Sequence, residues 1–508
     1  MKQFILFILL SIGHKLIYAQ VSVSDLSLLY GKYEVGFRHY VCNDSTRSYK
    51  RLYDFTGKIL PRPIPISVWF PAIPKAGTKL MTVENYMTIL KDEEEWQELP
   101  DSRILEWFYY SNSESNKRHL AETTKAKSNL RPLSQKFPVV IYAPSYQASS
   151  AENFALCEFL ASHGFIVLSS PSRGTESRFL DGGTTRDIET QARDIEFLIA
   201  EISKNPFADI NNLAVVGFSF GGISNVLAQM MDKRIKLIIC LDGSIRYQYS
   251  KIQQSPYFNL PGFDVPFLFM SQKEIPAQVI KEDKIDPSLN TTFKFYDSLK
   301  NSNAYYFKFN DLTHSYFSSM GVLFAERDAR QDKSDSAIMK SYKWLNIYTL
   351  NFLNAFVNKD SQAKQFLEAQ PADNGILNDA VIKLSEKKAV AKEFSFDDFN
   401  VLAIKQNYQS LAALYTSVKN NHPDFKMEEW KLNTLGLSLL FKNKLQAGIN
   451  ILLLNAMLFP ESANTYDSLG EGYLIIGDKE KASKNFKKSL ELNPQNENAI
   501  DKLKILNK

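Results

Sequence analysis

The amino-acid sequence predicts an α/β fold, with a mostly parallel sheet covered by helices on both faces, followed by an all-α region. Three observations support this prediction. Short apolar runs alternate with helical patterns over the first two-thirds of the chain. One of these runs leads into a glycine-flanked serine and then into a helical pattern. Near the C-terminus, a set of small and large residues recurs after 34 residues.

The apolar runs have the length of buried strands. They cover residues 139–143, 165–169, 213–216, 237–241, 266–270 and 304–309. Nearly continuous apolar strands separated by helices are typical of a parallel sheet buried on both faces. Between the second and third runs, residues 187–202 place isoleucine and alanine three and four apart, which predicts an amphipathic helix. Residues 65–70 predict an antiparallel strand that enters the sheet.

Length and charge restrict the class of protein. A chain of 508 residues is expected to form two or three domains. The net charge of +4 and the lack of a basic run argue against a nucleic-acid partner. The three cysteines could form one disulfide at most, and Cys240 lies in an apolar run where a buried thiol is expected. No spacing of histidine and cysteine predicts a metal site, and no cofactor is expected.

The N-terminus resembles an export signal. Lys2 precedes an apolar run over residues 4–12, and Ala19 is the small residue after which a signal peptidase would cut. The run is short for a bilayer span, so an uncleaved anchor is the weaker reading. We therefore expect residues 1–19 to be a signal peptide and the protein to be exported, periplasmic or secreted, with no stable membrane span.

The motif G-x-S-x-G at residues 217–221 is the most informative stretch. An apolar strand, residues 213–216, runs into it, and a helical pattern over residues 222–231 leaves it. A serine between a strand and a helix in this motif is the nucleophile elbow of an α/β-hydrolase. Ser219 is therefore the candidate nucleophile, and the alternative is a glycine-rich turn with a bystander serine.

A serine hydroxyl needs a base to take its proton and an acid to orient that base. In this fold the chain order is serine, acid, histidine. Only His314 and His422 follow Ser219, and His314 stands just after the last predicted strand, whereas His422 lies in the repeat region. Asp242 and Glu274 both follow strands between serine and histidine, so topology does not decide between them. Position directly at a strand end favours Asp242, and Asp311 is expected to cap a loop.

Several segments resemble the platelet-activating-factor acetylhydrolase family and its dienelactone-hydrolase-like bacterial relatives. The similar segments are residues 62–71, 160–167, 192–194, 217–222, 240–243 and 313–314. The similarity covers about residues 30–355. It implies an acid after the strand that follows the nucleophile helix, which matches Asp242. It also implies short acyl groups, as in an acetylhydrolase, or a phospholipid-type ester as substrate.

An oxyanion hole for the reaction needs two backbone donors. One is expected to be the N–H of Phe220, directly after the nucleophile. Alignment with the family pattern places the other at Tyr146. Here the chain departs from the family, because it reads Pro-Ser-Tyr-Gln at residues 144–147 where the family has a His-Gly-x-Gly turn. The absence of glycine restricts how this loop can fold.

Three segments interrupt or follow the α/β pattern. Residues 75–135 are polar, carry aromatic residues at 107–110, and are either a lid or insertion that roofs the site or ordinary surface helices. Residues 359–393 are charged with scattered apolar residues and are expected to be a linker with a short helix, after a hydrolase domain over residues 20–358. Residues 394–508 contain the 34-residue recurrence, which resembles the tetratricopeptide repeat.

The sequence thus predicts an exported serine hydrolase that cleaves a carboxylic ester through Ser219, His314 and Asp242. A small ester or lipid is the expected substrate, and the C-terminal repeats are a candidate surface for a protein partner. A serine peptidase of the same fold is one alternative. A non-catalytic hydrolase-like scaffold whose repeats bind protein is the other.

Overall fold

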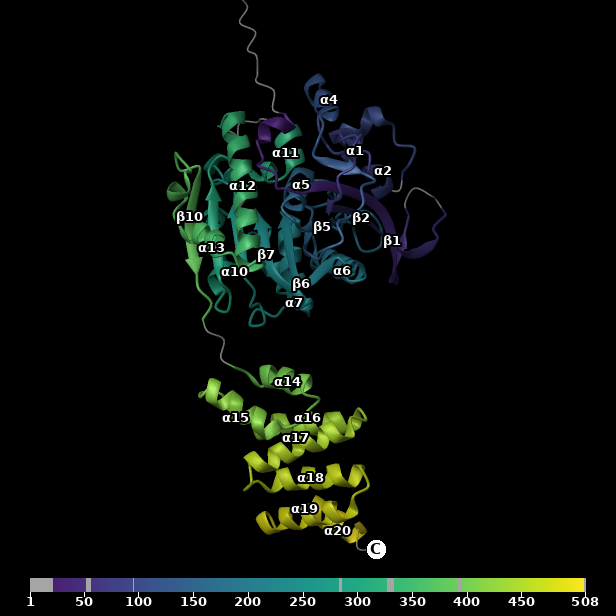
Figure 1. Ribbon diagram of the computed structural model, residues 1–508, viewed down its shortest axis with the longest axis vertical. Helices are drawn as coiled ribbons and strands as arrows, with labels where there is room; N and C mark the ends of the chain where they lie inside the picture. The colour runs from purple at the N-terminus through teal and green to yellow at the C-terminus, as the bar shows by residue number, and fades with distance from the viewer. Residues whose placement is uncertain are drawn as a thin grey trace, which may run out of the picture. The chain divides into compact units, whose positions relative to one another are not determined.

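The structure is a computed structural model, and it describes residues 22–51, 56–94, 96–282, 286–326, 333–390 and 394–506. The chain divides into two compact units, Met1–Val390 and Ala391–Lys508 (Figure 1). The expected signal peptide lies outside the described residues. No helix among the described residues is long and apolar enough to cross a membrane.

A single ten-stranded sheet forms the centre of the first unit, in the order β10-β9-β8-β7-β6-β4-β5-β2-β1-β3. Neighbouring strands from β5 to β9 run parallel, while β10, β2 and β1 join their inner neighbours antiparallel. The strands are β1 (Glu34–Lys50), β2 (Ile59–Ala72), β3 (Ala126–Ser128), β4 (Phe137–Ala143), β5 (Ile166–Ser169), β6 (Ala208–Phe218), β7 (Ile235–Leu241), β8 (Phe267–Ser271), β9 (Ala304–Phe309) and β10 (Val381–Lys387).

Helices cover both faces of this sheet, and each face has its own hydrophobic cluster. One face is covered by α6 (Thr185–Ile202), α7 (Phe220–Met231), α8 (Tyr249–Ile252) and α10 (Lys294–Ser298). The other is covered by α1 (Val83–Met87), α2 (Leu90–Glu93), α3 (Ile104–Trp107), α5 (Phe154–Ser162), α11 (Ser319–Phe324), α12 (Asp335–Phe356) and α13 (Ser361–Glu368). The predicted mostly parallel α/β sheet of the hydrolase type is confirmed.

The helix predicted over residues 187–202 shows how the sequence sets its own boundaries. Thr184 caps α6 by accepting a hydrogen bond from the N–H of Asp187, whose carboxylate bonds back to the cap. The apolar stripe that begins at Ile188 is buried along its whole length against the sheet. Periodicity in the sequence therefore placed both the helix and its buried face.

The expected linker over residues 359–393 is wrong for most of its length. Residues of α13, among them Leu367, are buried in the core of the first unit. Further on, β10 pairs antiparallel with β9 and forms the edge of the sheet. An unpaired β9 would leave a row of N–H and C=O groups open, and β10 satisfies them. The first unit therefore ends at Val390 rather than near residue 358.

The segment over residues 75–135 is anchored to the core. It contains α1, α2, α3, α4 (Glu114–Leu120) and β3, which pairs with β1 at the end of the sheet. Tyr86 donates a hydrogen bond of 2.8 Å to the buried carboxyl of Glu158 on α5. The same carboxyl accepts hydrogen bonds from the N–H groups of Lys125 and Ala126. Both ends of the segment are thus fixed to one helix.

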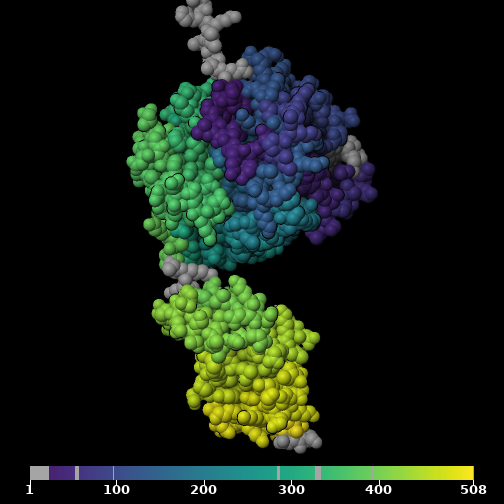
Figure 2. Space-filling model, viewed as in Figure 1, coloured from purple at the N-terminus to yellow at the C-terminus, as the bar shows by residue number. Residues whose placement is uncertain are grey.

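The N-terminal described residues pack beside this segment. The short 3₁₀ helix η1 (Val23–Leu26) contacts α12, and Leu26 is buried in the core. In Figure 2 this purple segment lies between blue residues of the insertion and green residues of the later helices of the unit. The described chain is therefore part of the fold from its beginning.

The second unit is entirely helical, as predicted. Its helices are α14 (Phe396–Lys405), α15 (Leu411–Asn421), α16 (Glu429–Phe441), α17 (Leu445–Leu458), α18 (Ala463–Ile475), α19 (Lys479–Leu492) and α20 (Glu497–Leu506). A side chain at Gly436 would lie 2.7 Å from Leu452, and one at Gly470 would lie 2.7 Å from Phe486. The second contact repeats the first, because each of its residues stands 34 positions later in the chain. Small residues therefore let successive helix pairs cross closely in the same way.

Candidate active site

Ser219 lies on a tight turn between β6 and α7, at the carboxyl end of the parallel strands. Its φ of 51° is in the left-handed region, which costs about 1–3 kcal/mol in a residue other than glycine. The turn depends on the flanking glycines, because a Cβ at Gly217 would lie 2.4 Å from the carbonyl oxygen of Gly221. A Cβ at Gly221 would lie 2.0 Å from the carbonyl oxygen of Ala143 at the end of β4. The glycines are thus required by close backbone approach.

Three side chains from separate strands meet at this turn. The Oγ of Ser219 lies 2.9 Å from Nε2 of His314, and Nδ1 of His314 lies 2.6 Å from Oδ2 of Asp242. A carboxylate only accepts hydrogen bonds, so Nδ1 carries the proton and Nε2 is left to accept one from the serine hydroxyl. Asp242 is fully buried and His314 is half exposed. The structure therefore brings together the serine, histidine and acid that the sequence selected.

The position of Asp242 is fixed by two residues that the sequence did not single out. Its Oδ1 accepts hydrogen bonds of 3.1 Å from the hydroxyl of Tyr247 and from the N–H of Gln272. The side chain of Gln272 in turn accepts a hydrogen bond of 3.0 Å from the N–H of His314. Burial and the nearby Asp242 raise the pKa of Tyr247, which keeps this hydroxyl protonated as a donor. Gln272 therefore ties the acid loop to the histidine loop.

The other titratable candidates lie elsewhere. Glu274 is exposed and pairs with Lys308 at 2.9 Å. Asp311 accepts a hydrogen bond of 2.8 Å from Ser341 of α12, in line with a loop residue. His422 belongs to the second unit, where its ring stacks on Phe394. Of the two acids that topology left open, the structure places Asp242 and not Glu274 at His314.

The expected oxyanion donors come from two neighbouring segments. Phe220 is the first residue of α7, and the first N–H groups of a helix have no acceptor within the helix. Tyr146 lies in the loop after β4, and its ring meets the ring of Phe220 edge-on at 5.8 Å. The Tyr146 hydroxyl donates to the carbonyl of Leu180 and accepts from the N–H of Gly182. Both residues therefore border the turn that carries Ser219.

The loop over residues 144–150 is held by two buried carboxyl groups that the sequence gave no reason to select. Glu152 accepts hydrogen bonds from both the N–H and the hydroxyl of Ser145. Glu93, on α2, accepts from the N–H and the hydroxyl of Ser150. Burial raises the pKa of both carboxyls, while the hydrogen bonds they accept act in the opposite direction. Polar contacts with Glu152, just after the loop, and with the distant Glu93 thus stand where glycines were expected.

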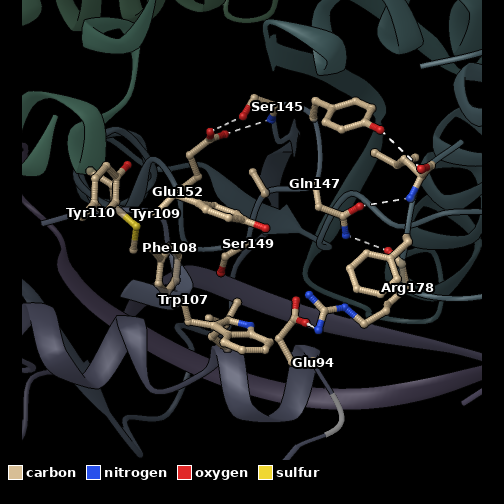
Figure 3. Close-up of a pocket in the computed structure, with 16 residues that line it drawn as sticks. Glu94, Trp107, Phe108, Tyr109, Tyr110, Ser145, Gln147, Ser149, Glu152 and Arg178 are labelled. Atoms are coloured by element: carbon tan, nitrogen blue, oxygen red, sulfur yellow. Dashed lines mark hydrogen bonds and ion pairs between the residues drawn. The ribbon is translucent and has the colours of Figure 1, made fainter. Parts of the chain in front are cut away.

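A pocket of about 550 Å³ adjoins this loop (Figure 3). Its lining combines the loop, the insertion and the segment around residue 179. The aromatic members of that lining are Trp107, Phe108, Tyr109, Tyr110, Tyr146 and Phe179. Residues 107–110 of the insertion thus line this pocket.

The part of the chain that the structure describes contains no candidate metal cluster and no disulfide. No cluster of histidine, cysteine and carboxylate side chains there could hold a metal ion. All three cysteines are unpaired, and Cys240 is buried in β7 as expected. Burial raises the pKa of the Cys240 thiol, so it remains a neutral apolar side chain.

The fold and the turn around Ser219 are those of an α/β-hydrolase. No protein-family model matches the chain, and no curated protein matches it. Among solved structures the chain is similar to a ferulic acid esterase from Streptomyces cinnamoneus, at 15% sequence identity and a TM-score of 0.49. This similarity covers 70% of the present chain and 97% of the esterase.

Proposed function

We propose that the protein is a serine hydrolase that cleaves a carboxylic ester through Ser219, His314 and Asp242. The observation that carries the proposal is the continuous hydrogen-bonded series from Ser219 through His314 to Asp242, at 2.9 and 2.6 Å. A serine, a histidine and a buried carboxylate in this order make up the catalytic apparatus for acyl transfer. Nothing in the helical unit offers a comparable arrangement among its described residues.

The reaction proceeds in two halves. Nε2 of His314 takes the proton of Ser219 as its Oγ attacks the ester carbonyl, and the same nitrogen then gives that proton to the departing alcohol. Water repeats the sequence on the acyl-enzyme, which releases the carboxylic acid and restores the serine. Asp242 keeps the imidazole in the tautomer that leaves Nε2 open.

The negative oxygen of the tetrahedral intermediate is stabilised by two backbone N–H groups. The N–H of Phe220 stands at the positive end of the α7 dipole, which favours negative charge there. The N–H of Tyr146 supplies the second donor, because its loop borders the same turn. Each donor contributes about 3–4 kcal/mol to such a transition state.

The substrate class follows from the resemblance seen in the sequence. It supports short-acyl esters, as in an acetylhydrolase, or phospholipid-type esters. A peptidase of the same fold would use the same three residues, so substrate panels rather than the triad separate the two activities. A non-catalytic scaffold would leave Ser219 unreactive.

Labelling with a fluorophosphonate tests the proposal directly. We expect the folded protein to be labelled at Ser219 and to hydrolyse 4-nitrophenyl acetate, and the Ser219→Ala variant to do neither. Absence of labelling in folded wild-type protein would favour the scaffold. Cleavage of peptide amides in preference to esters would favour the peptidase.

A matched pair of variants tests the acid. Asp242→Asn is expected to lower kcat by about four orders of magnitude, because it disturbs the tautomer of His314. Glu274→Gln changes a carboxylate of the neighbouring loop that pairs with Lys308, and it is expected to leave kcat unchanged. The reverse result would exclude Asp242 as the acid.

Export and the nature of the repeats belong to the same proposal. We expect cleavage after Ala19, so the mature protein from its native cell would begin at Gln20 when its N-terminus is sequenced. The recurrence of the Gly436–Leu452 contact at Gly470–Phe486 supports a tetratricopeptide-type array that binds a protein partner. A pull-down tests the partner. We expect a protein to be retained by the full chain and not by a control chain that ends at Val390.

A further inference from the structure

The pocket beside the loop over residues 144–150 is walled by aromatic side chains from two separate segments. Trp107 and Phe108 come from the insertion, and Phe179 comes from the connection between β5 and α6. Figure 3 shows residues 107–110 along one side, with Ser145 and the Glu94–Arg178 ion pair at opposite ends. At about 550 Å³ the pocket is in the range that holds a whole small-molecule ligand.

At one end of the pocket, an arginine side chain packs against two of the aromatic rings. The guanidinium of Arg178 lies 5.5 Å from the ring of Trp107 and 4.4 Å from the ring of Phe179. The charge is neutralised by Glu94, and both side chains are more than nine-tenths buried. A paired guanidinium held against two rings presents a flat, weakly hydrated surface. This end therefore suits a flat group rather than a flexible chain.

Two of the polar side chains of the lining are already engaged in hydrogen bonds. Ser145 donates to Glu152, and the amide of Gln147 bonds to the backbone of Arg178 and Leu180. A sugar ring needs many partners for its hydroxyls, and displacing these bonds would leave buried groups unpaired. The pocket is better matched to an apolar ring.

Two residues of the pocket lining lie next to the candidate site. Tyr146 lines the pocket and also contacts Phe220, the residue after the nucleophile. Met320, on α11, lines the pocket shortly after the turn that carries His314. The pocket therefore borders the loop that is expected to supply an oxyanion donor at Ser219.

We propose that this pocket binds the aromatic ring of an aryl-bearing ester, which rests on the proposed ester hydrolysis at Ser219. Offset-stacked and edge-to-face contacts with Trp107, Phe108 and Phe179 favour an aromatic ring over a saturated ring of similar size. The ring is carried either on the acid or on the alcohol of the ester. In both cases the recognised chemistry is the same.

Matched esters and variants test the proposal. Methyl 3-phenylpropanoate and 2-phenylethyl acetate carry the ring on the two sides, and their cyclohexyl counterparts are saturated controls. For at least one of the two aromatic esters, we expect the wild-type kcat/KM to exceed the value for the matching cyclohexyl ester. Phe108→Ala and Phe179→Ala should each raise the KM for that aromatic ester about fivefold. The control Tyr257→Ala removes a similarly exposed ring that does not line the pocket, and it should change nothing.

Equal losses for phenyl and cyclohexyl esters would overturn the proposal, as would unchanged KM in both pocket variants. A binding measurement separates this failure from failure of the proposed function. The Ser219→Ala protein should bind 3-phenylpropanoate in calorimetry more tightly than 3-cyclohexylpropanoate, and Phe179→Ala in that background should abolish the difference. Binding without fluorophosphonate labelling of the wild type would reject the hydrolase and keep the pocket. Labelling without selective binding would do the opposite.

Discussion

Two loops at the same edge of the sheet are built in opposite ways. The turn around Ser219 is shaped by Gly217 and Gly221, which allow backbone atoms to approach where a side chain would clash. The loop over residues 144–150 contains no glycine and takes a left-handed φ only at Gln147. Buried Glu152 and the insertion's Glu93 hold that loop through its serines.

The conformation of the first loop is specified by its own residues, whereas that of the second is specified by carboxyl groups outside it. The glycine turn is specified by five consecutive residues, so which substitutions it tolerates depends on steric fit. A loop held by carboxyl groups depends on burial, since a buried carboxyl must keep its hydrogen-bond partners. Damage to the first loop should therefore be steric and large, and damage to the second should be graded and chemical.

Gly221→Ala should have the largest effect. The new Cβ would lie 2.0 Å from the carbonyl oxygen of Ala143, which forces the turn away from β4 and moves Ser219 relative to His314. We expect kcat/KM for 4-nitrophenyl acetate to fall about a hundredfold or more, because a displacement near 1 Å has that cost. Gly77→Ala is the control: its φ of 74° strains an alanine, but nothing lies within 4 Å of the new Cβ, so no close backbone approach is lost. Activity of Gly221→Ala close to that of the wild type would show that the turn does not need the close approach to Ala143.

Glu152→Gln should have a smaller effect through the second loop. The amide keeps one acceptor oxygen but puts an NH2 donor where the other oxygen stood, so the two hydrogen bonds donated by Ser145 are no longer both accepted and the N–H of Tyr146 shifts. We expect kcat to fall about tenfold, less than the loss of a whole oxyanion donor, with little change in KM for a small ester. Exposed Glu98→Gln serves as the control. An unchanged kcat would mean that this loop supplies no donor.

The same contrast explains what the sequence could predict. The strands, the α6 stripe, Ser219 and His314 follow from local patterns and from the small number of histidines. Asp242 and Glu274 could not be separated by topology, because both follow adjacent strands and only the three-dimensional position of each carboxylate distinguishes them. Gln272 and Glu93 act through contacts between segments distant in sequence, and Glu152, although it stands close to Ser145 along the chain, belongs to no motif. The edge strand β10 was not predicted, because its largely polar sequence shows no regular alternation of apolar and polar residues.

The last expected effect is on stability rather than on activity, and it concerns the buried network behind the second loop. His39 shares a hydrogen bond of 3.0 Å with Ser67, which in turn bonds to Ser150 at 2.7 Å. Burial lowers the pKa of His39 from 6.5 to about 4; the attraction of Asp92 partly opposes this shift, and the repulsion of Arg173 adds to it. Between these values the unfolded chain binds the proton and the folded protein does not. Stability should therefore fall as the pH drops from about 6.5 to 4, by up to about 3 kcal/mol from this group.

His39→Gln keeps a hydrogen-bonding side chain beside Ser67 but removes the titration. We expect its free energy of unfolding, measured by urea denaturation followed by tryptophan fluorescence, to decline less than that of the wild type between pH 7 and 5. His422→Gln changes an exposed histidine of the other unit and should follow the wild type over this range. Parallel curves for wild type and His39→Gln would show that the imidazole takes up its proton in the folded protein as readily as in the unfolded chain. The support of the second loop would then be insensitive to acid, and the contrast with the glycine turn would rest on Glu93 and Glu152 alone.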